Sequence, residues 1–308
     1  MQTAAIGQSE LRSTRVIYGC MRVLGTWNRA EMTAQRRREA LSALEAAVEA
    51  GYNHFDHADI YAHGESERVF GEFLAGNPGL RERLIITTKC GIRWEGEGGP
   101  GAPHRYDFSR DWIERSCETS LRRLGVDTID VYLLHRPDVL MDPDEIAGVF
   151  DRLHASGKVR HFGVSNFTSS QTALLQSRLS RPLVCNQIEV HPLRLAPIED
   201  GTIDDLCRLR ITATSWSPVA GGRLFAAPGD DPKLARLVSV LDEEACAHGV
   251  SRTGILIAWL LRHPATILPI YGSRQPQRIR DAVAGDAVVM SRESWYRIYL
   301  AARGKALS

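Results

Sequence analysis

Residues 129–135 read Ile-Asp-Val-Tyr-Leu-Leu-His, an apolar run of strand length that stops at His135. A second such run stops at Lys89, and a third is followed by Asp56 and then by Tyr61. In a parallel α/β barrel, the carboxyl ends of the strands form the face at which active sites lie. An imidazole, an ammonium, a carboxylate and a phenol gathered on that face can deliver a proton to a carbonyl oxygen. The four residues therefore indicate both a barrel and the place of its active site.

Strand-like and helix-like segments alternate along the whole chain. The expected strands cover residues 16–20, 52–56, 84–88, 129–134, 159–164, 183–186, 211–216 and 266–270. The expected helices cover residues 36–50, 66–74, 109–124, 143–155, 168–178, 200–209, 232–248, 253–262, 277–283 and 292–302. Eight βα units in succession predict a (β/α)8 TIM barrel of the α/β class, a single domain over residues 1–308, with extra helices before strand 8 and at the C-terminus.

An open, doubly wound sheet is the alternative fold. It would need a glycine fingerprint after the first strand, and residues 19–25 do not match GxGxxG. The least regular stretch, residues 91–107, is rich in Gly and Pro and follows the third strand. We expect a long functional or mobile loop there, on the active-site face.

Composition excludes several classes of protein. The 308-residue chain has a net charge of +1, so we expect neither a nucleic-acid partner nor an anionic membrane. Its six cysteines are widely spaced and form no CxxC or His/Cys cluster, which predicts reduced thiols and no metal site. The longest apolar run, residues 254–261, is far shorter than the roughly 20 residues of a membrane span. Residues 1–10 are polar and do not form a secretory signal, so we expect a cytoplasmic protein.

These motifs resemble the aldo-keto reductases, which are NAD(P)H-dependent carbonyl reductases on a (β/α)8 barrel. Residues 55–61, Phe-Asp-His-Ala-Asp-Ile-Tyr, are similar to the family's Asp-Thr-Ala-x-x-Tyr segment, with His57 in the Thr position. Lys89 and His135 coincide with the family's lysine and histidine. Residues 157–167, Gly-Lys-Val-Arg-His-Phe-Gly-Val-Ser-Asn-Phe, are close to the superfamily signature. The resemblance covers nearly the whole chain and is nearest to the small bacterial predicted-oxidoreductase branch.

Tyr61 is the expected general acid. A free phenol has a pKa of about 10, which is high for donation near neutral pH. An ammonium ~4 Å away would favour the phenolate by on the order of 4 kcal/mol, or about three pKa units before desolvation opposes it. We expect Lys89 to supply that charge and Asp56 to hold the ammonium in place. His135 is expected to orient the carbonyl oxygen and to stabilise negative charge that develops on it.

The resemblance implies that later strands supply the cofactor face. Ser165, Asn166 and Gln187 are expected to bind the nicotinamide carboxamide, and Trp216 to stack on the ring. The Gly221-Gly222 pair would let backbone N–H groups approach a pyrophosphate. The complete expected cofactor set is Gly19, Met21, Arg22, Asp56, Ser165, Asn166, Gln187, Trp216, Ser217, Pro218, Gly221, Gly222, Arg223, Gly272, Ser273, Arg274, Arg278 and Asp281.

NADPH is favoured over NADH. Ser273 and Arg274 follow the eighth strand and are expected to bind the adenosine 2′-phosphate, because guanidinium pairs bidentately with phosphate. Arg278 begins a helix whose N-terminal end favours anions. The family often has Glu-Asn one turn later, whereas this chain has Asp281 followed by Ala282. One adenine contact of the family is therefore missing from the sequence.

The expected substrate walls are Trp27 after the first strand, Trp94 in the long loop, and Tyr61 and His135 themselves. The sequence thus predicts an NADPH-dependent reductase that converts an aldehyde or ketone to the alcohol. A low-turnover NADP(H)-binding redox sensor of the same fold is the alternative. A metal-dependent barrel hydrolase would need an HxH after the first strand, which is not present. The sequence leaves open the physiological carbonyl compound, the strictness of the NADPH preference and the oligomeric state.

Overall fold

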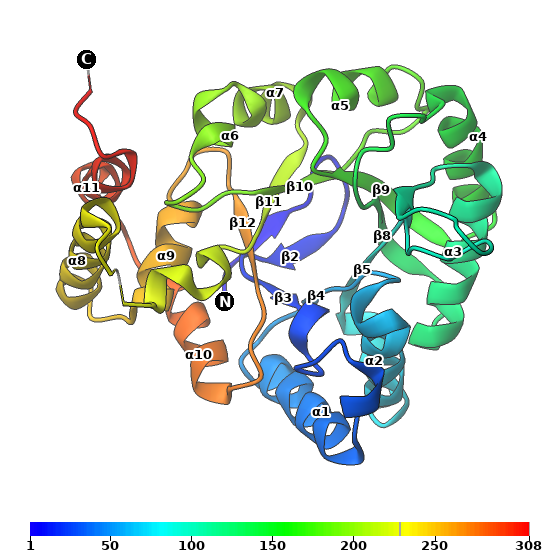
Figure 1. Ribbon diagram of the computed structural model, residues 1–308, viewed down its shortest axis with the longest axis horizontal. Helices are drawn as coiled ribbons and strands as arrows, with labels where there is room; N and C mark the ends of the chain where they lie inside the picture. The colour runs from blue at the N-terminus through cyan, green and yellow to red at the C-terminus, as the bar shows by residue number, and fades with distance from the viewer. Residues whose placement is uncertain (228, 308) are drawn as a thin grey trace.

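The computed structural model describes residues 1–227 and 229–307. Its centre is a closed barrel of parallel strands in the order β10-β11-β12-β3-β4-β5-β8-β9 (Figure 1). The barrel strands are β3 (Ile17–Gly19), β4 (His54–Asp56), β5 (Ile85–Cys90), β8 (Ile129–Leu134), β9 (Val159–Ser165), β10 (Cys185–Glu189), β11 (Thr212–Trp216) and β12 (Leu268–Tyr271). The predicted barrel fold is confirmed.

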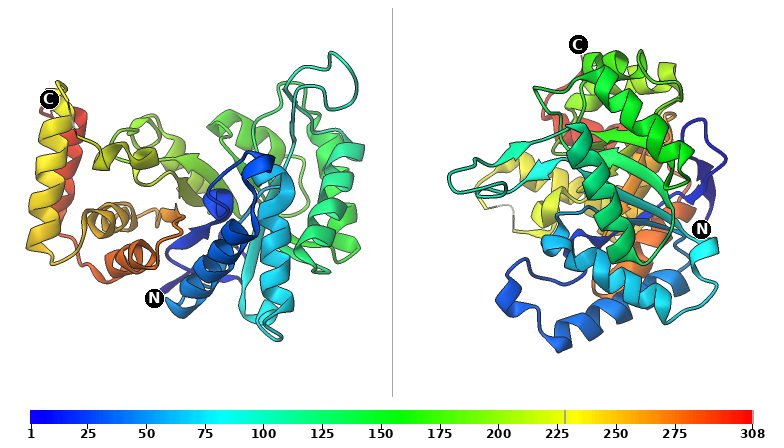
Figure 2. Two further views of the ribbon diagram at one scale, coloured as in Figure 1. Left: turned by 60° about the horizontal axis from the view of Figure 1, so that its bottom comes forward. Right: turned by 90° about the vertical axis from the view of Figure 1, so that its right-hand side faces the viewer.

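Helices cover the outside of the barrel (Figures 1 and 2). They are α1 (Ala34–Glu49), α2 (Glu65–Ala75), α3 (Arg110–Leu124), α4 (Pro143–Ala155), α5 (Ser169–Gln176), α6 (Ala196–Glu199), α7 (Thr202–Leu209), α8 (Pro232–Ala247), α9 (Arg252–Leu261), α10 (Pro276–Ala284) and α11 (Arg292–Arg303). The extra helix α8 packs beside α11 at the outer edge of the molecule (Figure 2). None of the helices in the described part of the chain is long and apolar enough to cross a membrane.

Helix α4 illustrates how the sequence produces these elements. Asp142 caps its N-terminus, because the carboxylate accepts two backbone N–H groups of the first turn, and Pro143 suits the first helical position. Ile146 and Phe150, four residues apart, point from one face of the helix into the core. The Phe150 ring stacks on Phe162 of β9 at 3.9 Å between centroids. Capping and one apolar face thus place the helix against its strand.

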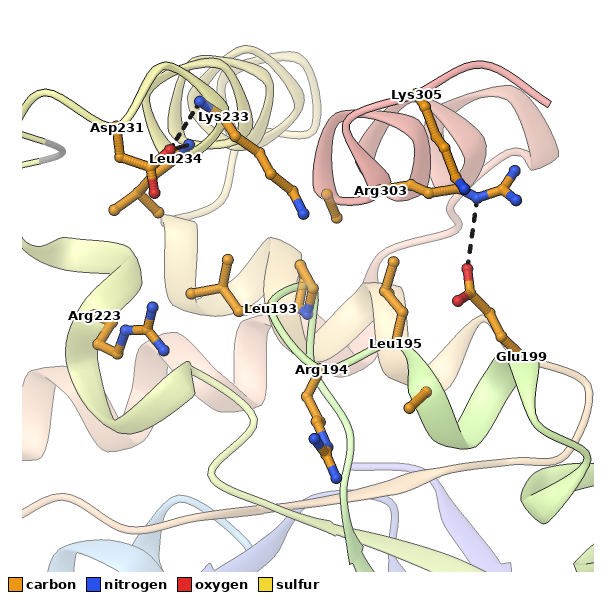
Figure 3. A pocket seen from close by; sticks show the side chains of 13 residues that line it. Leu193, Arg194, Leu195, Glu199, Arg223, Asp231, Lys233, Leu234, Arg303 and Lys305 are labelled. Atoms are coloured by element: carbon orange, nitrogen blue, oxygen red, sulfur yellow. Dashed lines mark hydrogen bonds and ion pairs between the residues drawn. The ribbon is translucent and has the colours of Figure 1, made fainter.

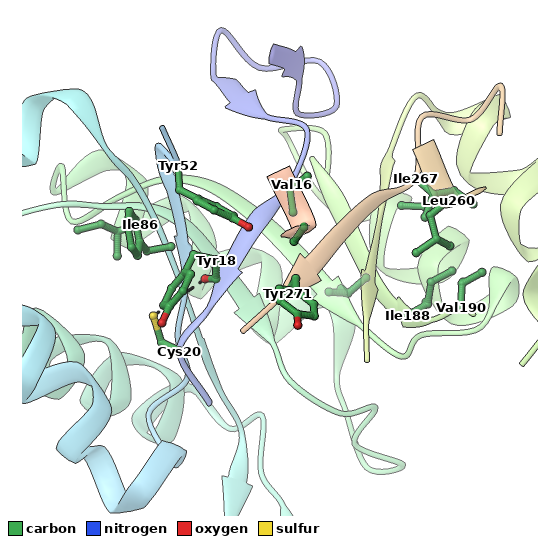
Figure 4. Packing of buried hydrophobic residues seen from close by; sticks show 14 of the residues in the cluster. Val16, Tyr18, Cys20, Tyr52, Ile86, Ile188, Val190, Leu260, Ile267 and Tyr271 are labelled. Carbon is green, nitrogen blue, oxygen red and sulfur yellow. Dashed lines mark hydrogen bonds between the residues drawn. The ribbon is translucent and has the colours of Figure 1, made fainter. Parts of the chain in front are cut away.

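The layer between strands and helices is apolar, and Figure 4 shows part of it around β3 and β12. Tyr18 of β3 is buried and meets Tyr52 edge to face, with ring centroids 5.8 Å apart. The Tyr18 hydroxyl donates a hydrogen bond of 2.7 Å to the Ser273 carbonyl. This bond ties the first barrel strand to the loop that follows the last one, at the end of the barrel where the site lies.

An N-terminal hairpin closes the opposite end of the barrel. Strands β1 (Thr3–Ala5) and β2 (Arg12–Thr14) pair antiparallel. Between them, Ile6 and Leu11 are buried in one cluster with the barrel residues Val131 and Leu133. The sequence predicts only a polar segment over residues 1–10, so this hairpin was not expected. The hairpin therefore packs against the amino-terminal end of the barrel, opposite the end at which the predicted site lies.

The Gly- and Pro-rich stretch after β5 contains a second hairpin that was expected as an irregular loop. Strand β6 (Ile92–Arg93) pairs antiparallel with β7 (Arg105–Tyr106). The Arg93 guanidinium donates to Asp107 at 2.7 Å, and this ion pair fixes the base of the hairpin. The glycines occupy the connecting turn, where several adopt positive φ values.

Candidate active site

Three side chains of the predicted tetrad meet at the carboxyl end of the barrel. Asp56 ends β4, Lys89 lies near the end of β5, and Tyr61 begins a short 3₁₀ helix, η3 (Tyr61–Gly64). Lys89 Nζ donates hydrogen bonds of 2.7 Å each to Asp56 Oδ2 and to the His57 carbonyl. Its third hydrogen bond, of 3.0 Å, reaches the Tyr61 hydroxyl oxygen. Because an ammonium has three donors, every one of them is used.

Lys89 is a buried, permanent cation at neutral pH. Its side chain has no exposed surface. Burial lowers the pKa of Lys89, but the Asp56 carboxylate and the Tyr61 oxygen outweigh this effect, so the pKa is raised above its ordinary value. The ammonium therefore keeps its charge and acts as a fixed electrostatic group beside the phenol.

Two opposing effects set the pKa of Tyr61. Burial raises the pKa of Tyr61 more than Lys89 lowers it, and Asp56 adds to the increase. Desolvation therefore outweighs the attraction of the ammonium, because the phenol lies in an enclosed setting that disfavours the phenolate. Tyr61 is a neutral hydroxyl, which holds a proton that it can give away.

His135 completes the tetrad as a neutral imidazole. It follows β8 directly, and its ring lies edge-on to the Tyr61 ring at 5.9 Å between centroids. Burial lowers the pKa of His135 well below its usual value, and the charges of Lys89 and Arg136 lower it further. A neutral imidazole still has one N–H donor. It can donate a hydrogen bond without adding a second positive charge.

A cavity of about 650 Å³ opens at this end of the barrel, with Asp56, Tyr61 and His135 on its wall. Trp27 is also on the wall, as predicted, whereas Lys89 lies behind it. The wall further holds these residues of the expected cofactor set: Gly19, Met21, Arg22, Ser165, Asn166, Gln187, Trp216, Ser217, Pro218, Gly221, Gly222, Gly272, Ser273, Arg278 and Asp281. Residues that follow each of the eight predicted strands thus line one cavity.

A polar network joins the expected nicotinamide residues to the tetrad. Gln187 Nε2 donates to Asp56 Oδ1 at 2.8 Å, across the barrel from β10 to β4. Asn166 Nδ2 donates to Ser165 Oγ at 2.7 Å and to the His135 carbonyl at 3.3 Å. The contact from Gln187 to Asp56 was not foreseen, since sequence spacing gives no sign of a bond between strands that do not pair.

Backbone geometry brings peptide groups close to the cavity. Asn166 and Ser217 end two strands with φ of 61° and 52°, a left-handed conformation that Asn tolerates and that is found at functional sites. A Cβ on Gly272 would lie 2.2 Å from the Gly19 carbonyl oxygen, so only glycine permits this approach. Backbone groups, rather than bulky side chains, therefore form this part of the wall.

The guanidinium of Arg274, which was expected to bind the 2′-phosphate, pairs with a carboxylate of the protein in this structure. Arg274 Nη1 donates to Glu39 of α1 at 2.9 Å, and the residue is absent from the cavity wall. Gly25 leaves room for it, because a Cβ there would lie 2.4 Å from the guanidinium carbon. The Glu39 carboxylate thus binds the guanidinium that was expected to bind a phosphate.

Arg223 and Trp94 also lie off the wall. Arg223 belongs to the 3₁₀ segment η5 (Ala220–Phe225) and lines a different cavity of about 510 Å³ beside α8 and α11 (Figure 3). Trp94 packs edge-on against Trp27 at 6.2 Å and supports the wall from behind. The expected contacts of Arg223 with the cofactor and of Trp94 with the substrate stay predictions.

Some wall residues were missed by the sequence analysis. Arg136, Ile60, Ile92 and Phe225 all line the cavity. Arg136 comes directly after His135, so its position at a strand end was a usable signal. Ile92 and Phe225 come from the hairpin after β5 and from η5, whose shapes the sequence pattern does not specify. Among the described residues, no cluster of His, Cys, Asp and Glu could hold a metal ion.

The fold and this site define a class of protein: a (β/α)8 barrel enzyme with a phenol, a buried ammonium and a neutral imidazole at its open end. The sequence profile of the aldo/keto reductase family matches residues 15–301, and the chain belongs to this family. It is therefore an oxidoreductase of the aldo/keto reductase type. Membership implies a nicotinamide cofactor and a small-molecule substrate.

Relatives cover almost the whole chain. The oxidoreductase YdhF of Escherichia coli is 43% identical over 282 residues, which are 92% of this chain and 93% of that protein. A 6-dehydroglucose reductase of Novosphingobium aromaticivorans is 41% identical over 292 residues, covering 92% of this chain and 91% of that protein. The structure of a glycerol dehydrogenase from Gluconobacter oxydans superposes with a TM-score of 0.85 at 22% identity, covering 100% and 98% of the two chains, and supports the fold alone.

Three buried histidines predict a marked acid lability. Burial lowers the pKa of both His54 and His57 to about 3 and that of His135 well below its usual value. Below pH 6.5 the unfolded chain binds these three protons and the folded chain does not, so stability falls as the pH falls. Each histidine contributes a slope of about 1.4 kcal/mol per pH unit.

The change His57→Met isolates one of these contributions. Neither ring nitrogen of His57 has a hydrogen-bond partner, and the ring packs against Phe70 at 4.6 Å. We expect the slope of unfolding free energy against pH, measured by urea unfolding between about pH 4.5 and 6, to decrease by about 1.4 kcal/mol per pH unit. Equal slopes for the variant and the parent protein would contradict the neutral, buried state of His57.

Proposed function

We propose that this chain is an NADPH-dependent reductase that converts an aldehyde or ketone to the corresponding alcohol. The observation that carries the proposal is the Tyr61 hydroxyl, which is on the cavity wall and 3.0 Å from the buried Lys89 ammonium. His135 lines the same cavity. A proton donor, a fixed cation and a neutral hydrogen-bond donor are what reduction of a carbonyl requires of the protein.

The residues present fit a nicotinamide dinucleotide. Gly221 and Gly222, the pair assigned to the pyrophosphate, line the cavity, and no atom lies within 4 Å of where a Cβ would be at either residue. The cavity volume of about 650 Å³ is within the range of cofactor sites. Asn166 accepts a hydrogen bond of 2.9 Å from Trp216 Nε1, which holds the indole in place as a platform for the ring. When bound, the reduced cofactor supplies a hydride.

Tyr61 transfers its proton to the carbonyl oxygen as negative charge develops there. The raised pKa of Tyr61 does not prevent this transfer, because an alkoxide is far more basic than a phenolate. Lys89 then stabilises the phenolate, since a cation 3.0 Å from the oxygen opposes the charge that remains. His135 orients the carbonyl oxygen, and its neutral state avoids a second buried cation beside Lys89.

The preference for NADPH rests on Ser273 and Arg278, which both line the far end of the cavity. Arg278 belongs to the first turn of α10, whose free N–H groups add to the attraction for an anion. We assign the adenosine 2′-phosphate to these two residues instead of to Arg274, whose guanidinium is paired with Glu39.

Replacing the proton donor gives a direct test. The variant Tyr61→Phe should lower kcat for NADPH-dependent reduction of 4-nitrobenzaldehyde by about 10²–10⁴-fold, because general-acid catalysis is lost. The dissociation constant for NADPH should stay within about threefold, since the hydroxyl is assigned to the substrate side. Tyr106→Phe, in the exposed hairpin strand β7, is the matched control and should retain turnover. Equal rates for Tyr61→Phe and the parent protein would overturn the assignment.

The cofactor assignment is tested by comparing two arginines. Arg278→Gln should raise the dissociation constant for NADPH by roughly 10- to 100-fold and that for NADH much less, because one charged hydrogen bond is worth about 1.5–3 kcal/mol. Arg274→Gln is the control and should change both constants by a similar, small factor. Fluorescence titration with each nucleotide measures the effect. A larger NADPH-specific loss in Arg274→Gln would place the 2′-phosphate there instead.

A further inference from the structure

Arg136 is an unpaired cation on the wall of the cavity. It follows His135 directly, and its guanidinium carbon lies 5.3 Å from the centre of the Trp216 ring. The ion pairs and side-chain hydrogen bonds of the described residues leave its donors unused. A guanidinium offers five N–H groups in a planar fork that matches a carboxylate. Such a group, half-buried and without a partner, is suited to bind an anion that enters the cavity.

The neighbouring carboxylates are already satisfied. Asp138, two residues further along, accepts backbone N–H groups at 3.0 and 2.9 Å. On the wall itself, Asp56 is held by Lys89 and Gln187. Asp281 accepts a 2.8 Å hydrogen bond from the side chain one turn before it in α10. None of these three carboxylates is paired with Arg136, so the guanidinium charge remains available to a ligand.

The surroundings hold Arg136 in position. The indole beneath it is tied through Nε1 to Asn166 Oδ1 at 2.9 Å. The same amide donates to the His135 carbonyl, which is the peptide group just before Arg136. A cation over an aromatic face is attracted by the ring and gives up little conformational freedom when it binds. The guanidinium is therefore preorganised close to the reacting end of the cavity.

We infer that Arg136 binds the carboxylate of an aldehyde substrate that carries one carboxylate group, an inference that rests on the proposed function. The other arginines on the wall, Arg22 and Arg278, belong to the expected cofactor set, which leaves one cation for a monoanion. Trp27, Ile92 and Phe225 add apolar surface to the same cavity wall. A short or aromatic ω-oxo acid has this combination of groups.

The reaction leaves the carboxylate unchanged. A hydride, carrying two electrons, adds to the aldehyde carbon, and the C=O π bond becomes the C–O single bond. The proton on the oxygen comes from Tyr61, which regains one from solvent. The aldehyde is reduced to a primary alcohol and the dihydronicotinamide is oxidised. Arg136 only positions the substrate, so its effect depends on whether the substrate carries the anionic group.

The test compares 4-formylbenzoate with its neutral methyl ester. For each protein, the ratio of kcat/KM for the acid to kcat/KM for the ester is measured by NADPH oxidation. The change Arg136→Gln should lower this ratio by roughly 10- to 100-fold, as expected for a charged hydrogen-bonded pair. Arg136→Lys should recover part of the ratio, because it keeps the charge and loses the bidentate fork. Arg83→Gln, at the amino-terminal end of β5, removes the same charge far from the site and should keep the parent ratio.

Two results would overturn the inference while the proposed function stands. One is an unchanged ratio in Arg136→Gln when the parent protein reduces both aldehydes. The other is an equal loss for glyceraldehyde, a neutral polyhydroxy aldehyde, which would assign Arg136 to hydroxyl groups instead. NADPH binding by each variant, measured by fluorescence, confirms that it is folded. If the parent protein oxidised NADPH with none of these aldehydes, the proposed function would fail first, and this inference with it.

Discussion

The buried ammonium of Lys89 is the constraint on which the rest of the site depends. Taking a charged amine out of water carries a penalty of several kcal/mol unless its donors are all satisfied. Here three acceptors meet that need: a carboxylate, a main-chain carbonyl and a phenol oxygen. These acceptors belong to β4 and to the segment that follows it, so the ammonium also fixes the path of the chain from Asp56 to Tyr61. The position of Tyr61 follows from this arrangement.

The same charge sets the electrostatics around it. A second cation near Lys89 would be repelled, and His135 is accordingly held neutral by burial and by the positive charges close to it. The Asp56 carboxylate uses one oxygen for Lys89 and the other for Gln187, which connects β4 with β10 across the barrel. Strain in the backbone is concentrated at the same end, at Asn166 and Ser217. The barrel thus supplies a rigid frame whose open end is organised around one buried charge.

Much of this arrangement could be predicted from sequence, because strand ends and titratable residues coincide. The tetrad was predicted from two sources: the rule that parallel strands present their carboxyl ends on one face, and the resemblance to the aldo-keto reductases in the order of the four residues. The side-chain contacts that could not be predicted depend on partners distant in sequence. No local sequence pattern encodes that Arg274 pairs with Glu39 or that Arg223 lines the cavity beside α8.

The N-terminal hairpin was not predicted because its two apolar residues, Ile6 and Leu11, are too few to give a periodic signal. The pKa of Tyr61 required the balance between desolvation and attraction, which depends on burial in the folded protein.

The central claim is that the cation 3.0 Å from Tyr61 stabilises its phenolate. The most direct measurement replaces Tyr61 with 3-fluorotyrosine, whose phenol is more acidic, and follows its titration by ¹⁹F NMR. The comparison is between the otherwise unaltered chain and the double variant Asp56→Asn, Lys89→Met, which removes the cation together with its counterion. The account predicts a higher phenol pKa in the double variant. An unchanged or lower pKa would contradict it.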